Sequence, residues 1–306
     1  MKPASGPRGH APGEAKRAAG MDATFEQLVL GLPEELRRVA EALPFQLGLI
    51  PNEDGGFEDF VVLEPNRDLV GFAAENPLNP GELLVSHERL ERFRRAHHLA
   101  VIHGLLLERG RDPKLRALRR EVRWAWEAAL GDAVGSRRPA RAFARSCIAQ
   151  TLLASRRARA LERLAIAGGT LSTPLYAEVT CEKLRWFGAT AQAMLVWLEC
   201  PERGSLLMQA YDRFALSLQC LDDALGSFGG PGRNQPAKMP HPAPAGLFRA
   251  APRLCQQASE LSRRGGFHRL AEWFDGFHHT VDGMSVGSVP QHDVDRLLLS
   301  MTAPGN

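Results

Sequence analysis

Two adjacent acids, Asp222 and Asp223, lie near the end of a mostly apolar stretch, YDRFALSLQCLDDALGSF, over residues 211–228. A helical period places Asp222 on one stripe with Leu218, and it sets Gln219 four residues before Asp223. Burying two neighbouring carboxylates is costly unless a positive charge neutralises them. Mg²⁺ would serve, because it takes oxygen ligands and is usually shared between carboxylates and a substrate phosphate. The alternative is a solvated helix end before the glycines that follow.

Other segments of the chain must position the further site residues around Asp222 and Asp223. Residues 85–108 have a strongly helical pattern whose second half is nearly all apolar, so we predict a buried helix with His103 inside it and Glu108 at its end. Residues 175–198 predict one helix that ends before Pro201 and carries Lys183 and Phe187. A Pro/Gly-rich segment with Lys238 follows Gly226, and its length suggests a lid, a binding loop or disorder.

The rest of the chain is also mainly helical in pattern. The other helical ranges are 24–43, with a break at Pro33, 114–134, 140–167 and 246–301. Residues 44–83 are less regular, with a brief β-like run over 60–63, and form either a long connection or a small hairpin. We predict an all-α protein of about ten helices, with a disordered tail over 1–22 and a single domain over 23–306.

Composition narrows the classes of function. The 306 residues are 44% hydrophobic and 24% charged, which is typical of a globular protein with a large core. The net charge of +3 is too small to indicate nucleic acid, and no apolar run is long enough to span a bilayer. Five widely spaced cysteines without a CxxC pair, and no secretory signal, favour a cytoplasmic protein. Arginine greatly outnumbers lysine, so we interpret the arginine runs as solvated faces.

The order of several motifs resembles the trans-prenyltransferases, the head-to-tail isoprenyl diphosphate synthases, over residues 85–245. The matching elements are Tyr176, Glu182-Lys183-Leu184, Gly188-Ala189-Thr190-Ala191, Leu218-Gln219-Cys220-Leu221-Asp222-Asp223, a blurred loop with Lys238, and Ile102 to Glu108 in the place of an upstream acidic motif.

The resemblance implies a class I isoprenoid synthase-type helical bundle around a central apolar cavity. It implies Mg²⁺ held by Asp222, Asp223 and Glu108, and a prenyl diphosphate held by Lys183 and Lys238. His103, Leu107, Gln219 and Phe187 would line the cavity. From the residues alone, His103 and Gln219 could equally be hydrogen-bonded core groups, and Glu108 the first exposed residue after an apolar helix.

The chain departs from the family pattern at several positions. Gly104 and Leu105 replace the two leading aspartates of the upstream motif, Gly226 replaces the third acid of the second motif, and Leu184 follows Lys183 where the family has threonine. The leading hypothesis is an enzyme that ionises a prenyl diphosphate with Mg²⁺ for cyclisation or prenyl transfer. The family's isopentenyl diphosphate segment is missing, which favours a cyclase or an unusual transferase over an ordinary chain-elongating synthase.

Two other hypotheses stay open. The chain could be a catalytically silent homologue that serves as a partner subunit or binds an isoprenoid, in a homodimer or a heterodimer with another prenyltransferase. It could also be an unrelated helical scaffold in which the aspartate pair is incidental.

Overall fold

The computed structural model describes residues 20–41, 43–50, 54–109, 113–168, 171–228 and 244–283. Fourteen helices, α2 to α15, occupy this part of the chain; it contains no β-strand, and Glu75 and Leu83 form an isolated bridge. The all-α prediction is therefore confirmed. The excess over ten helices comes from several very short helices near the N-terminus and from one predicted helix that divides in two.

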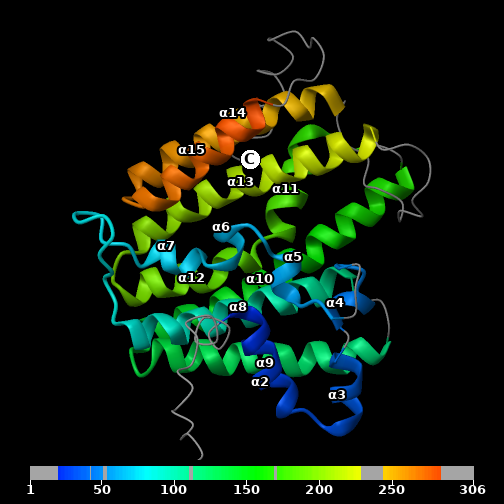
Figure 1. Ribbon diagram of the computed structural model, residues 1–306, viewed down its shortest axis with the longest axis vertical. Helices are drawn as coiled ribbons and strands as arrows, with labels where there is room; N and C mark the ends of the chain where they lie inside the picture. The colour runs from blue at the N-terminus through cyan, green and yellow to red at the C-terminus, as the bar shows by residue number, and fades with distance from the viewer. Residues whose placement is uncertain are drawn as a thin grey trace, which may run out of the picture.

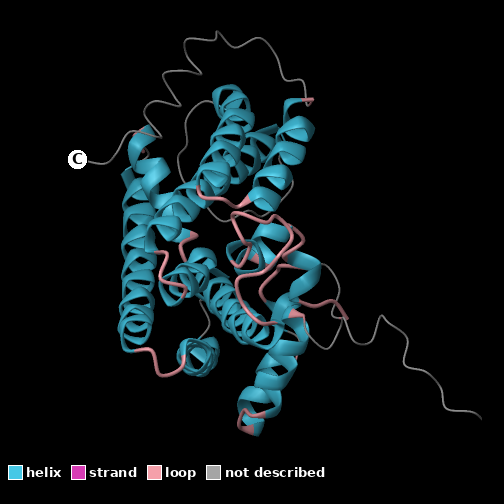
Figure 2. Ribbon diagram, turned by 90° about the vertical axis from the view of Figure 1, so that its left-hand side faces the viewer, coloured by secondary structure: helices cyan, strands magenta, loops and turns pink. Residues whose placement is uncertain are grey.

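Long helices form most of the molecule. They are α8 (His87–Arg109), α9 (Pro113–Val134), α10 (Arg138–Gly168), α13 (Pro201–Phe228), α14 (Pro244–Arg264) and α15 (His268–Asp282), with α11 (Thr173–Lys183) and α12 (Trp186–Trp197) between α10 and α13. In Figure 1, α13, α14 and α15 lie together on one side and α8 and α9 on the other, and Figure 2 gives the turned view. Helix α12 packs against both α8 and α13, which makes it the central element.

The N-terminal part consists of short helices. They are α2 (Met21–Leu30), α3 (Glu34–Ala40), α4 (Leu43–Gln46), α5 (Phe57–Phe60), α6 (Glu64–Arg67) and α7 (Leu69–Ala73). Pro33 caps α3, so the predicted break is confirmed. The predicted tail is too long at its end, because Met21 is buried and begins α2; residues 1–19 lie outside the described part.

The β-like pattern over residues 60–63 does not form a strand, so of the two alternatives for residues 44–83 the small hairpin at this run is excluded. Phe60 ends α5, and the Val61 N–H donates to the Phe57 carbonyl at 2.8 Å, so it closes a helical turn. Val61 is buried and Val62 is 64% exposed, which explains the alternating pattern. A period of two over four residues does not by itself create a strand, because no neighbouring strand pairs with this segment.

The predicted helix over residues 175–198 divides at Leu184 and Arg185. Phe187 N–H donates to the Leu184 carbonyl at 3.1 Å, so the chain makes a turn between α11 and α12. No glycine or proline marks this turn, so the sequence pattern gave no signal for it. The turn places Lys183 at the end of α11, and it directs Trp186 and Phe187 into the core.

Aromatic side chains fill the core where α12, α13 and α15 meet. Phe187 lies 5.9 Å from Tyr211 between ring centroids, and Phe214 lies 6.0 Å from Tyr211 and 4.9 Å from Phe274. All four are buried. Burying each such ring stabilises the fold by about 1.5–3 kcal/mol, so this cluster fixes the position of α12 relative to its neighbours.

Candidate functional site

The two aspartates of α13 face different surroundings. Asp223 is 5% exposed, and its Oδ2 accepts hydrogen bonds from Tyr176 Oη at 2.8 Å and from Gln219 Nε2 at 3.0 Å. Asp222 is exposed. Successive residues of an α-helix point about 100° apart, so a straight helix cannot turn both carboxylates toward one interior ion. The structure therefore separates the pair that the sequence suggested would act together.

Tyr176 is the buried partner that holds Asp223. Burial raises the pKa of the Tyr176 hydroxyl, and the neighbouring Cys220 and Asp223 raise it further. The hydroxyl therefore stays protonated at neutral pH, and it donates a hydrogen bond to the Asp223 side chain. This bond links α11 to α13, and Gln219, half-buried one turn before Asp223, adds a second donor from the same helix.

Lys183 and Glu108 come together as the sequence suggested, but they bind each other. Lys183 Nζ lies 3.4 Å from Glu108 Oε2 and 3.2 Å from Glu162 Oε1. The three side chains are 18–23% exposed, and they come from α11, α8 and α10. Burial alone would lower the pKa of Lys183, but the two carboxylates raise it above its ordinary value.

Arg159 adds a second cation to this cluster. Its Nη1 donates to the Leu107 carbonyl at 2.7 Å, and its charge lowers the pKa of Glu108 against the larger raising effect of burial. Two cations and two carboxylates leave no formal net charge here. Glu162 and Arg159 were not predicted as site residues, because we interpreted the arginine-rich helix as a solvated face. Their spacing of three residues, which places them on one face of α10, was the sequence signal that they could interact.

The interior beside Gly104 is filled by an indole ring. A Cβ atom on Gly104 would lie 2.2 Å from Trp186 Cε2, and Trp186 is 1% exposed. The resemblance drawn from the sequence would place Gly104 at the position of the family's first metal-binding aspartate, which stays a prediction. The glycine and the tryptophan therefore fit each other, and the tryptophan occupies the space that a side chain at position 104 would need.

The remaining predicted site residues are mostly in the core. His103 is 3% exposed, with its ring centroid 5.9 Å from that of Trp126. Burial and, to a smaller extent, nearby arginines lower the pKa of His103 to about 4. Phe187 is buried and Leu107 is half-buried. Lys238 lies outside the described residues.

The residues that are present do not form a favourable Mg²⁺ site. In the second half of α8 the acid is Glu108; it is bound to Lys183, although its buried Oε1 has no hydrogen-bond partner among the described residues. On α13, Asp223 already accepts two hydrogen bonds and Asp222 is exposed. No group of three or more His, Cys, Asp or Glu side chains in the described ranges is arranged to hold a metal. Mg²⁺ binding stays a prediction.

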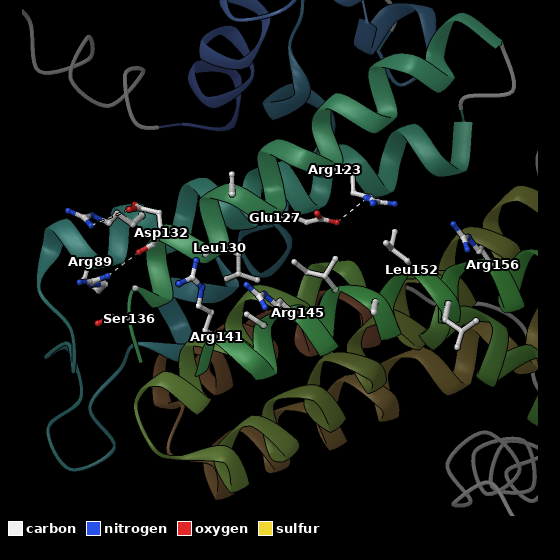
Figure 3. A pocket seen from close by; sticks show the side chains of 18 residues that line it. Arg89, Arg123, Glu127, Leu130, Asp132, Ser136, Arg141, Arg145, Leu152 and Arg156 are labelled. Atoms are coloured by element: carbon white, nitrogen blue, oxygen red, sulfur yellow. Dashed lines mark hydrogen bonds and ion pairs between the residues drawn. The ribbon is translucent and has the colours of Figure 1, made fainter. Parts of the chain in front are cut away.

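A groove that the sequence did not reveal runs along α9 and α10, with the first turns of α8 beside it (Figure 3). Its volume is about 1140 Å³, and it contains none of the predicted site residues. Its lining combines small and aliphatic side chains with six arginines: Arg89, Arg92, Arg123, Arg141, Arg145 and Arg156. The sequence signal was present in α10, where arginines at 141 and 145 alternate with buried residues at 144 and 148.

Comparisons of this chain with protein-family models, with curated proteins and with solved structures found no match. None of the helices that the structure describes is both long and apolar enough to cross a membrane.

Proposed function

We propose that this chain is a non-catalytic, isoprenoid synthase-like subunit that acts by binding a partner protein. The observation that carries the proposal is the packing of Trp186 on Gly104. In the resembled family that position faces the metal and the diphosphate. An indole ring in direct contact with the helix backbone leaves no room there for a carboxylate, so it supports a structural use of the same scaffold.

The charged residues support the same proposal. Ionising an allylic diphosphate creates negative charge on the leaving group, and an enzyme must present uncompensated positive charge to it. Here Lys183 is neutralised by Glu108 and Glu162, and Arg159 is bound to a backbone carbonyl. A diphosphate would have to replace contacts that already satisfy these cations.

The paired charges instead have a structural role. The Lys183 cluster joins α11 to α8 and α10, and the Tyr176–Asp223 bond joins α11 to α13. Removing one member of a buried ion pair typically costs about 3–5 kcal/mol, because the other charge is left without a partner. Such contacts fix the relative positions of four helices, which is the property that a subunit needs.

Magnesium-dependent diphosphate release provides the test. The purified chain is incubated with Mg²⁺ and each prenyl diphosphate from C10 to C20, and inorganic diphosphate is measured. We expect no release above that of a heat-denatured sample. Release that Asp223→Asn abolishes and Asp222→Asn leaves intact would overturn the proposal, because it would assign catalysis to the inward-facing acid.

One observation favours the second candidate, an enzyme that ionises a prenyl diphosphate. Tyr176 and Lys183 lie seven residues apart, so they share one face of α11 about 10 Å apart along its axis. Asp223 of α13 is bonded to Tyr176, and Glu108 of α8 is paired with Lys183, so both acids contact α11. The Trp186→Ala variant separates the two candidates. If the remaining acids can bind Mg²⁺ and diphosphate once the indole is removed, this variant should release more diphosphate than the native chain; a non-catalytic subunit should show no increase.

A further inference from the structure

The groove along α9 and α10 has an apolar floor. Leu130, Ala144 and Ile148 line it and are buried, whereas Leu153 lies at its edge and is 66% exposed. Figure 3 shows Leu130 and Leu152 on the facing helices, with arginine side chains around them. A single exposed leucine is ordinary on a protein surface, so the charges around this floor, more than Leu153, determine what the groove binds.

The rim of the groove carries an excess of positive charge. Six arginines face two acids, Glu127 and Asp132, which leaves a formal excess of four positive charges. Glu127 pairs with Arg123 at 2.9 Å, and Asp132 lies 3.7 Å from Arg92. Arg141, Arg145 and Arg156 are exposed and form no ion pair with any residue in the described ranges. An acidic partner would therefore find unpaired cations on α10.

The spacing of these arginines distinguishes three possible ligands of the groove: an anionic amphiphile, a second copy of this chain and an acidic helix. Arg141 and Arg156 are fifteen residues apart on α10, which corresponds to about 22 Å of helix. An anionic amphiphile has one charged end, and a site for it would gather its cations at one place. A second copy of this chain would bring its own arginines against these in a two-fold contact. A helix with an apolar face and carboxylates along both flanks matches both the floor and the rim.

We propose that the α9–α10 groove binds an acidic amphipathic helix of a partner protein. The inference rests on the proposed function as a subunit, and it names the contact surface and the chemistry of the partner. The helix lays its leucine-rich face on Leu152 and Leu153, beside the buried Leu130 and Ile148, and its carboxylates pair with Arg141, Arg145 and Arg156. The arginines contribute mainly to selectivity and to the rate of association.

A synthetic peptide of defined composition tests the groove. The probe is a fluorescein-labelled peptide of about 18 residues with leucines spaced i, i+3, i+4 and i+7 and glutamates on both flanks. A matched peptide has lysine in place of every glutamate. Anisotropy with the full chain should give saturable binding of the acidic peptide, at least about tenfold tighter than that of the basic one. Equal affinity for the two peptides would overturn the proposal.

Charge-reversal variants locate the binding. Arg141→Glu with Arg145→Glu should weaken binding of the acidic peptide about tenfold, since each change replaces an attraction by a repulsion. The control is Arg95→Glu with Arg264→Glu, which makes the same change in net charge at exposed arginines outside the groove. We expect less than about a twofold effect from the control. Equal weakening by both pairs would show only a general charge effect and would overturn the proposal.

Two other outcomes would assign the groove to a different occupant. If dodecanoate displaces the peptide at micromolar concentration and loses affinity in the Arg141/Arg145 variant, the groove is a site for an anionic amphiphile. If sedimentation equilibrium shows a dimer that the same variant dissociates, the occupant is a second copy. Both overturn the inference without affecting the proposed lack of catalysis, which depends separately on diphosphate release.

Discussion

The interior around α11 and the groove along α10 use the same kinds of residue in opposite ways. Around α11, Lys183 and Arg159 meet Glu108 and Glu162, so the charges cancel and the contacts are partly or fully buried. Along α10, Arg141 and its neighbours are exposed and outnumber the nearby acids.

This difference separates charges that stabilise the fold from charges that remain available to a partner. In the interior each ionised group already has its partner, so adding a ligand means breaking native contacts. At Arg141, Arg145 and Arg156 of the groove, a ligand would form ion pairs without replacing any in the described ranges. Substitutions in the interior should therefore change the free energy of unfolding, and those in the groove should change binding.

The largest expected effect comes from the contact between Gly104 and Trp186. Trp186→Ala should lower the free energy of unfolding by about 3–5 kcal/mol, because it removes a fully buried ring and leaves a cavity. Gly104→Ala should cost about 1–3 kcal/mol by overpacking the same contact. Urea denaturation measures both.

The double variant sharpens this test. If the two side chains compete for one space, Gly104→Ala with Trp186→Ala should lose less stability than the sum of the single losses. Strict additivity would mean that Trp186 does not occupy the space beside position 104, and the main support for a non-catalytic role would be lost.

The buried histidine on α8 should give the next largest effect, as a dependence of stability on pH. The pKa of His103 falls to about 4 because of burial and of the charges of Arg123, Arg119 and Arg159. Because its pKa in the unfolded chain is higher, its contribution to stability is complete above about pH 6.5 and is lost as the pH falls toward 4. The loss amounts to about 3 kcal/mol, at about 1.4 kcal/mol for each pH unit.

Denaturation curves of the native chain and of His103→Gln between pH 7.5 and 4 measure this contribution. The native chain should lose stability more steeply than the variant over that range. Parallel curves would show that the imidazole is protonated equally easily in both states. His98, whose pKa burial lowers to about 3, acts in the same direction in both proteins, so it cancels in the comparison.

Lys183 should give a somewhat smaller effect, because its cluster is partly exposed. Lys183→Met should cost about 2 kcal/mol, since it leaves Glu108 and Glu162 close together with only the charge of Arg159 nearby. Adding Glu108→Gln should recover part of the loss by removing one of the two repelling charges. No recovery in the double variant would indicate that Lys183 acts through its aliphatic stem instead of its charge.

The sequence predicted the fold class and most of the long helices, because their apolar periodicity is strong. It did not predict the turn at Leu184, where no glycine or proline interrupts the helical pattern. It also placed Asp222 and Asp223 as a pair, although one is exposed and the other is bonded to Tyr176. Which of two adjacent residues faces inward depends on how the helix is rotated, and that is set by packing against helices far away in the sequence.

The partners of Lys183 show the same limit. The resemblance placed Glu108 in the same site as Lys183, but Glu162 was not predicted; its one signal was the spacing of three residues from Arg159 on α10. The groove was missed for a related reason. Its six arginines come from α8, α9 and α10 and its apolar floor from α9 and α10, so the pattern of any single helix contains only part of it.

The groove should give the smallest change in stability. Arg141→Glu with Arg145→Glu should leave the free energy of unfolding within about 0.5 kcal/mol of the native value, because neither arginine has an ionic partner among the described residues. The same variant should weaken binding of the acidic peptide about tenfold. A large loss of stability would mean that these arginines have a structural role like that of Lys183, and the distinction between the two regions would fail.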